Sequence, residues 1–216
     1  MPQRSTASGQ RFQSCDGRDH WFKSSIVHDS VRECAIVRPW KLRHRSLAFS
    51  SPPWVELYVD TVELPDGSVH EDFHRIVLPE FAVTVAVTTD GRFVMIREYK
   101  HGPDCIVLNA AAGMLDPGEA PLDAARRELL EETGYGADDW QSLGSFVVDG
   151  GTGCGRAHLF LARGAVSVET PRPDATEEID VVVLDETALR AALAAGDVVM
   201  LPTACAIGLA FLALRT

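Results

Sequence analysis

The chain has 216 residues, of which 46% are hydrophobic and 24% are charged, an ordinary composition for one well-buried globular domain with an appendage. Its net charge of −11 argues against a general binder of nucleic acids or of anionic membranes, because both kinds of partner need a basic surface. The charge does not exclude a nucleotide substrate, since a bound metal ion can invert the local field.

The cysteines and the apolar runs indicate where the protein works. The five cysteines are scattered and form no Cys-x-x-Cys pair, which argues against a zinc site or a disulfide framework and predicts a reducing, cytoplasmic location. The first residues show no signal peptide. The longest apolar run, residues 204–214, is far shorter than the roughly 20 residues of a membrane span, so we expect no membrane partner.

Residues 1–36 differ from the rest of the chain. They are rich in Ser, Gly, Arg, Asp and Gln and show no sustained period of 2 or 3.6 residues, which argues against a packed element. We interpret them as a disordered extension, or as a misassigned start. Domain-like sequence begins near Val37-Arg-Pro-Trp40, and we expect residues 37–78 to form a small N-terminal antiparallel β unit.

Two strands are predicted on either side of the turn Pro65-Asp66-Gly67, one beginning near Val55 and one ending near Leu78. The second strand contains His70-Glu-Asp-Phe-His74, which matches the His-Glu-x-x-His zinc motif of metalloproteases. That motif works only on a helix. In a strand the two histidines lie about 13 Å apart, at roughly 3.3 Å per residue, which is too far to share one zinc ion. We therefore reject the protease interpretation.

The rest of the chain alternates strands and helices. The strands are expected at residues 81–88, 93–96, 105–108, 145–148, 157–161 and 179–184, with a hairpin turn at Asp90-Gly91. Helices are expected from Pro121 to a stop at Gly134, and at residues 186–195 and 203–214. This order predicts an α/β protein, a three-layer α/β/α sandwich with a mixed sheet over residues 79–216.

Three carboxylates share one face of the helix that begins at Pro121. Glu128, Glu131 and Glu132 are spaced i, i+3, i+4, and like charges at that spacing repel each other. Water and the neighbouring Arg126 or Arg127 could offset this repulsion, as on most solvated helix faces. The alternative is a hard divalent cation, which prefers oxygen ligands and suits diphosphate chemistry.

The residues around this helix resemble the signature of the Nudix hydrolase family. Every defined position is filled in the pattern Gly113-x5-Glu119-x7-Arg127-Glu-Leu-x-Glu-Glu132-x-Gly134-Tyr. The resemblance implies an enzyme that splits the diphosphate of a nucleoside diphosphate linked to another group. It implies that Glu128 and Glu132, with Glu131, ligate Mg²⁺ or Mn²⁺ together with the main-chain carbonyl near Ala112.

The same resemblance assigns supporting roles within the motif. We count Arg127 among the catalytic residues of the motif. The resemblance implies that it holds the loop to the helix through an ion pair with Glu119 and does not touch substrate. Gly113, Glu119 and Gly134 are expected to be structural. Pro117-Gly118 should allow the loop to turn sharply before the helix.

Beyond the signature, the chain is similar to the ADP-ribose and nucleotide-sugar pyrophosphatase branch of the family. The similarity lies in Trp54-Val-Glu-Leu-Tyr-Val-Asp and in Arg97-Glu-Tyr-Lys100. It implies a homodimer built partly by the N-terminal β unit, with Trp54 stacked on the base and Lys100, together with Arg97, at the diphosphate. The alternatives are strand packing for Trp54 and a solvated strand end for Arg97 and Lys100.

The general base and the substrate are less well defined. Glu177 or Glu178 lies where this branch carries an acidic loop and could take the proton of the attacking water, or the segment could be a plain acidic loop. Asn109 replaces the Glu usual in this branch. The loop at residues 149–158 has glycines, Arg156 and His158 in place of the usual acidic residue, so it either approaches a phosphate through backbone N–H groups or is a flexible hairpin.

The sequence therefore predicts a metal-dependent pyrophosphohydrolase that converts ADP-ribose to AMP and ribose 5-phosphate. The alternatives are an ADP- or UDP-sugar pyrophosphatase, or a non-catalytic Nudix module that senses a nucleotide. A sensor of that kind should have lost the metal glutamates, and all of them are present here. The expected partners are a small nucleotide substrate and a second copy of the chain, with no nucleic acid.

Overall fold

The computed structural model describes residues 37–174 and 178–215. Residues 39–216 form one compact unit, which is the part of the chain described below. The interpretation of residues 1–36 as an extension lies outside the described residues.

The first part of this unit is a three-stranded antiparallel sheet in the order β1-β2-β3, with β1 (Lys41–Ser51), β2 (Val55–Glu63) and β3 (Val69–Val77). The predicted strands on either side of the turn at Gly67 are confirmed as β2 and β3. The sequence did not predict β1. Its pairing with β2 is shifted between Leu42 and His44 and again between Leu47 and Phe49, and such irregularities erase the period of two.

The His-Glu-x-x-His segment lies within β3, as expected, and is not helical. His70 pairs with Val62 of β2, and His74 pairs with Val59. The two histidines are therefore four strand positions apart, as the rejection of a protease site requires.

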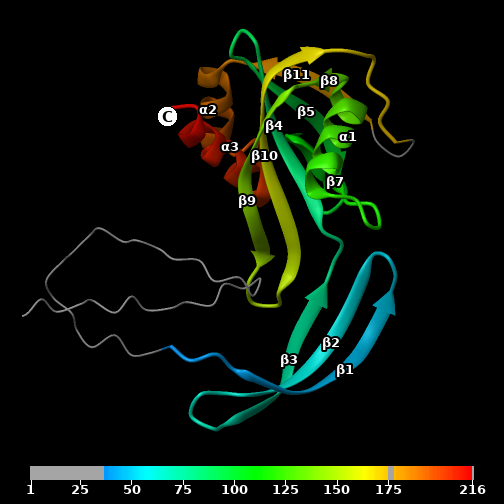
Figure 1. Ribbon diagram of the computed structural model, residues 1–216, viewed down its shortest axis with the longest axis vertical. Coiled ribbons are helices and arrows are strands. Elements are labelled where there is room, and N and C mark those ends of the chain that lie inside the picture. The colour runs from blue at the N-terminus through cyan, green and yellow to red at the C-terminus, as the bar shows by residue number, and fades with distance from the viewer. Residues whose placement is uncertain (1–36, 175–177, 216) are drawn as a thin grey trace, which may run out of the picture. The chain divides into compact units, whose positions relative to one another are not determined.

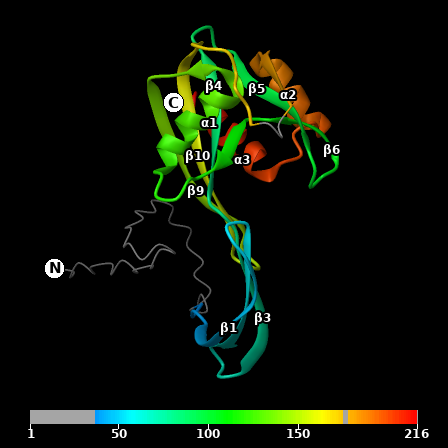
Figure 2. The ribbon, with the colours of Figure 1, turned by 90° about the vertical axis from the view of Figure 1, so that its right-hand side faces the viewer.

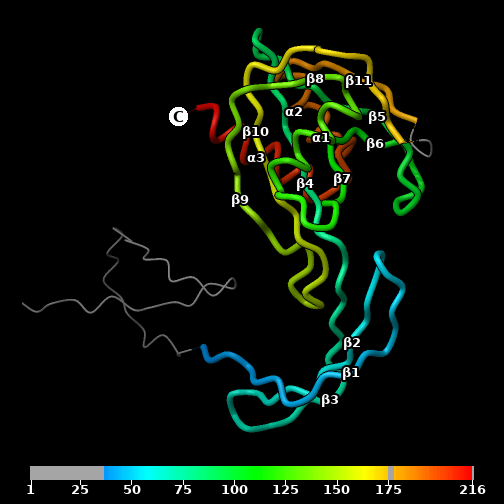
Figure 3. Tube along the Cα trace, turned by 45° about the vertical axis from the view of Figure 1, so that its right-hand side comes forward, coloured from blue at the N-terminus to red at the C-terminus, as the bar shows by residue number. Residues whose placement is uncertain are grey.

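The second sheet has eight strands, with a path in the order β11-β5-β4-β10-β8. Its strands are β4 (Phe81–Thr88), β5 (Phe93–Lys100), β6 (Cys105–Asn109), β7 (Ala111–Met114), β8 (Tyr135–Gly136), β9 (Asp139–Asp149), β10 (Cys154–Ser167) and β11 (Ile179–Leu184). Strand β10 runs parallel to β4, whereas the other pairs are antiparallel, so the sheet is mixed as predicted. Strands β9 and β10 form a long hairpin (Figure 3).

The predicted three-layer sandwich is confirmed. Helix α1 (Pro121–Thr133) covers one face of the sheet, and α2 (Glu186–Ala195) and α3 (Leu201–Ala213) cover the other (Figures 1 and 2). The strand period of two divides β4 between the layers. Val83 and Val85 pack with Ile207 of α3, and Ala86 packs with Leu129 of α1. Among the described residues, no helix is both long and apolar enough to cross a membrane.

Both ends of α1 lie where the sequence predicts. Pro121 occupies the first turn, where its missing N–H leaves no hydrogen bond unmade. Gly134 ends the helix with φ of 71°, and its N–H donates to the carbonyl of Leu130. The short strands β7 and β8 were not predicted, because Ala-Ala-Gly-Met and Tyr-Gly carry no alternation that distinguishes a strand from a loop.

Candidate active site

The carboxylates of α1 line a cavity of about 530 Å³. We call it the acidic cavity. Its wall is built from β5, β7, the loop after β7, α1 and the segment before β11. The lining residues are Lys100, Ala112, Gly113, Met114, Asp116, Arg127, Glu128, Glu131, Glu132, Pro173 and Asp174. The structure therefore brings together the three glutamates, the Ala112–Gly113 main chain and Lys100, all of which were singled out from the sequence.

Glu132 is anchored to β7. Its side chain is 1% exposed, and its Oε2 accepts a hydrogen bond of 2.9 Å from the N–H of Ala112. A buried carboxylate is costly unless hydrogen bonds or a cation compensate its charge. This contact fixes the Glu132 carboxylate at the edge of the sheet, beside the main chain expected to help hold the metal.

Arg127 links the helix to the loop. Its Nε and Nη2 each donate to the Glu119 carboxylate at 2.9 Å, and Nη2 also donates to the carbonyl of Met114. Its Nη1 lies 2.6 Å from Glu128 Oε1. The hydrogen bonds from Arg127, and a further one from the N–H of Asp116, lower the pKa of Glu119 to about 2. These contacts occupy the guanidinium group of Arg127 and include the expected ion pair with Glu119.

Gly113 leaves room for the carboxylate of Glu128. A Cβ atom at this position would overlap the carboxylate of Glu128. The backbone of Gly113 does not adopt a positive φ, so the requirement for glycine is one of space alone.

The chemical type of the available ligand atoms fits a hard divalent cation. Carboxylate oxygens from three glutamates and from Asp174 face one cavity beside a main-chain segment, and these are the ligands that Mg²⁺ and Mn²⁺ prefer. Across residues 37–174 and 178–215, no three acidic, His or Cys side chains already form a closed metal cluster. In the described arrangement, Glu128 contacts Arg127 and Glu132 contacts Ala112.

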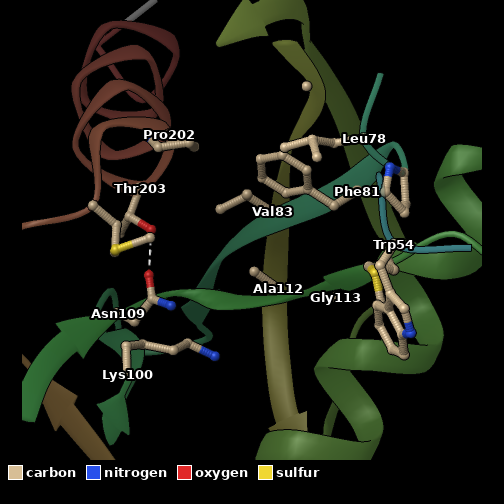
Figure 4. Close-up of a pocket in the computed structure, with 14 residues that line it drawn as sticks. Trp54, Leu78, Phe81, Val83, Lys100, Asn109, Ala112, Gly113, Pro202 and Thr203 are labelled. Atoms are coloured by element: carbon tan, nitrogen blue, oxygen red, sulfur yellow. Dashed lines mark hydrogen bonds between the residues drawn. The ribbon is translucent and has the colours of Figure 1, made fainter. Parts of the chain in front are cut away.

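Figure 4 shows a second cavity, which we call the apolar cavity. It has a volume of about 380 Å³ and adjoins the acidic cavity. The two cavities share Lys100 and residues 112–114 as lining residues. The remaining lining residues are Trp54, Leu78, Pro79, Phe81, Val83, Asn109, Gly155, Met200, Pro202 and Thr203. Most of these were not found from the sequence, because they come from segments far apart in the chain and no local pattern marks them.

Trp54 lies in the turn between β1 and β2 and lines the apolar cavity. Its side chain is 59% exposed, so the alternative of ordinary half-buried strand packing does not describe it. An exposed indole ring at a cavity can stack on a planar ligand.

Arg97 lies on the other face of β5 from Lys100. Side chains alternate along a strand, so Glu98 and Lys100 share one face and Arg97 lies on the opposite one. Arg97 lines a separate cavity with Ile106, Leu184 and residues of α2. The structure therefore does not bring Arg97 together with Lys100.

The acidic segment before β11 is described only in part. Glu177 lies outside the described residues, and Glu178 is exposed. The segment follows α1 closely, because the N–H of Arg172 donates to the carbonyl of Glu131 at 2.7 Å. This contact accounts for the presence of Asp174 in the acidic cavity.

The segment at residues 149–158 forms the end of the β9–β10 hairpin. His158 Nε2 lies 2.6 Å from Glu80 Oε2, and Arg156 Nε lies 3.8 Å from Glu80 Oε1. Both basic side chains therefore contact Glu80, and Gly155 lines the apolar cavity.

The chain is similar to known proteins in sequence and in structure. Residues 78–203 match the family model described as NUDIX domain. The chain is 36% identical over 132 residues to a methanol dehydrogenase activator of Bacillus methanolicus, covering 60% of this chain and 70% of the relative. It is 35% identical over 130 residues to an ADP-ribose pyrophosphatase of Bacillus subtilis, covering 59% and 69%. A crystal structure of an ADP compounds hydrolase superposes with a TM-score of 0.72 at 21% identity, covering 83% of this chain and 96% of the other.

Proposed function

This chain belongs to the Nudix family of hydrolases, and we propose that it hydrolyses ADP-ribose to AMP and ribose 5-phosphate. The observation that carries the proposal is the pair of adjoining cavities, one lined by carboxylates and one by apolar and aromatic groups, with Lys100 in the wall of both. A nucleoside diphosphate derivative has parts that match each cavity: a charged diphosphate and a flat base. The ADP-ribose pyrophosphatase among the relatives supports the choice of substrate.

Glu128, Glu131 and Glu132 would hold a divalent cation, Mg²⁺ or Mn²⁺, with the main chain at Ala112. When bound, such an ion neutralises charge that develops on the diphosphate and lowers the pKa of a bound water. The anchored carboxylate of Glu132 and the fixed approach of Gly113 to Glu128 support this assignment.

The chain's own residues orient the substrate. Trp54 stacks on the base, and the Lys100 ammonium group binds an oxygen of the diphosphate between the two cavities. Glu177 or Glu178 accepts the proton of the attacking water. Water attacks one phosphorus, the P–O bond of the bridge breaks, and the bridging oxygen leaves on the other phosphate.

We further propose that residues 37–78 form a unit that builds a homodimer. Large apolar side chains are exposed on the three-stranded sheet, in particular Leu42, Leu47, Phe49, Val69 and Val77. Exposed apolar side chains concentrated on one sheet are typical of a surface that a partner covers. Sedimentation velocity tests this proposal: the wild type should sediment as a dimer and the double variant Leu47→Glu/Phe49→Glu as a monomer, and a monomeric wild type would refute it.

The cytoplasm is the proposed location. Cys105, Cys154 and Cys205 are free thiols, which fits a reducing compartment.

A phosphate-release screen with phosphatase coupling tests the proposed activity. The panel contains ADP-ribose, ADP-glucose, UDP-glucose and other nucleoside diphosphate derivatives, each in Mg²⁺ and in Mn²⁺. We expect ADP-ribose to be hydrolysed faster than the other compounds of the panel. If a nucleotide sugar is hydrolysed fastest, the proposed reaction stands but the substrate is a nucleotide sugar. This result would agree with the presence of Asn109 where the branch usually has Glu. Binding without turnover of any compound would indicate a sensor.

A further inference from the structure

A row of three buried polar side chains joins α3 to β5 at the wall of the apolar cavity. Thr203, Asn109 and Glu98 are only 2%, 4% and 3% exposed, and they come from the first turn of α3, the end of β6 and the middle of β5. Thr203 Oγ1 donates to Asn109 Oδ1 (Figure 4), and Asn109 Nδ2 donates to Glu98 Oε1 at 2.9 Å.

The direction of each hydrogen bond in this row follows from its neighbour. An ionised carboxylate only accepts hydrogen bonds, so the Asn109 NH₂ group must face Glu98 and the Asn109 carbonyl must face Thr203. The Thr203 hydroxyl is then required to be a donor. Removing any one group leaves a buried partner unsatisfied, which is costly in a protein interior.

The row ends at Lys100. Lys100 Nζ lies 2.7 Å from Glu98 Oε2, the oxygen that Asn109 does not use. The Lys100 side chain is partly exposed and lines both the apolar and the acidic cavity. Glu98 is therefore held from one side by Asn109 and itself holds Lys100 from the other.

We propose that Thr203, Asn109 and Glu98 are positioning residues that fix the Lys100 ammonium group at the junction of the two cavities. They act through Lys100, although Thr203 and Asn109 also lie in the wall of the apolar cavity with at most 4% of their surface exposed. Their effect on turnover rests on the proposed function, because it assumes that Lys100 binds the diphosphate. Their effect on Lys100 itself does not depend on the identity of any substrate.

The row also explains why an amide at position 109 suits this chain. An aspartate there would place a second carboxylate against Glu98, and two carboxylates at about 3 Å cannot both remain ionised. Asn109 instead donates a hydrogen bond to Glu98 Oε1 and leaves Oε2 to Lys100. The residue that departs from the usual pattern of its branch is thus matched to its buried neighbour.

The test measures the mobility of Lys100 directly. The chain has three lysines, Lys23, Lys41 and Lys100, so ¹⁵N-labelled lysine gives few ammonium resonances, and Lys100→Arg identifies the one of interest. Nuclear relaxation of the Lys100 ammonium group is compared in the full-length wild type without substrate, in Thr203→Val, which keeps the volume and loses the hydroxyl, and in Thr203→Ser, which keeps the hydroxyl. Asn109→Asp probes the middle of the row in case Thr203→Val does not fold.

The expected result is a restrained ammonium group in the wild type and in Thr203→Ser, and a mobile one in Thr203→Val and in Asn109→Asp. With ADP-ribose as the probe, KM should rise about tenfold in the latter two while kcat changes less than about threefold, because an interaction used in binding is weakened. A mobile Lys100 in the wild type, or equal restraint in all variants, overturns the proposal. A wild type that does not hydrolyse ADP-ribose would refute the proposed function, and the relaxation data would still decide the role of the row.

Discussion

The acidic and apolar cavities share a wall, but the chain builds them in different ways. Most of the acidic cavity comes from residues 112–132, one continuous stretch in which helix spacing and a single ion pair set the geometry. The apolar cavity is assembled from residues 54, 78–83, 100, 109–114, 155 and 200–203, which only the folded sheet brings together. Under the proposed function, the reaction chemistry would depend on one motif, whereas substrate choice would depend on scattered residues. Each cavity should therefore respond to a different class of substitution.

The largest expected effect is on the acidic side. Gly113→Ala should lower kcat about a hundredfold or more, since the new Cβ displaces the Glu128 carboxylate from the place where it would hold a metal ion. Steady-state kinetics with ADP-ribose measure the change. Gly102→Ala is the matched control, because a Cβ there meets nothing within 4 Å. Equal kinetics in the two variants would show that the close approach of Glu128 is unimportant.

A smaller and different effect is expected on the apolar side. Trp54→Ala should raise KM for ADP-ribose about tenfold with little change in kcat, since base stacking contributes roughly 1–3 kcal/mol to binding. Trp54→Phe keeps a flat ring and should lose less. A fall in kcat at constant KM would mean that Trp54 acts on the chemistry, and the division between the two cavities would then be wrong.

The smallest expected effect is on stability at low pH. The pKa of Glu119 lies at about 2 in the folded chain, below the ordinary value of 4.5, so the ionised form stabilises the fold. This contribution is fully present above about pH 4.5 and is lost as the pH falls toward 2. It should be on the order of 1 kcal/mol, because the pair is partly exposed.

Urea unfolding at a series of pH values tests this contribution. The stability difference between the wild type and Glu119→Gln should shrink from pH 6 to pH 2.5. A stability difference that does not change with pH would show that the Arg127–Glu119 ion pair does not cause the loss of stability at low pH.

The same contrast explains what the sequence could predict. The bounds of α1, the strands at residues 81–88 and 179–184, and the α/β/α layering followed from periodicity and end signals, all of which are local. Helix spacing placed the carboxylates of α1 on one face, and the resemblance to the Nudix signature implied that they hold a metal ion. Strand β1 could not be predicted, because its two pairing irregularities break the alternation that marks a strand.

The residues around the apolar cavity also could not be predicted from local sequence patterns. Thr203 and Asn109 are 94 positions apart in sequence, and their hydrogen bond depends on the packing of α3 against the sheet. Arg97 was grouped with Lys100 because Arg97-Glu-Tyr-Lys100 resembles a segment of the pyrophosphatase branch, yet the strand directs the two side chains to opposite faces. Such contacts depend on tertiary packing, which no single stretch of sequence encodes.

The most direct test of the account is the turnover of ADP-ribose by Glu132→Gln, compared with the wild type and with Asp123→Asn. Asp123 lies on the same helix but is exposed and outside both cavities. We predict that kcat falls on the order of a thousandfold in Glu132→Gln, because the charge needed to hold the metal ion is lost, and stays at the wild-type level in Asp123→Asn. An unchanged rate in a folded Glu132→Gln protein would contradict the assignment of the reaction to the carboxylates of α1.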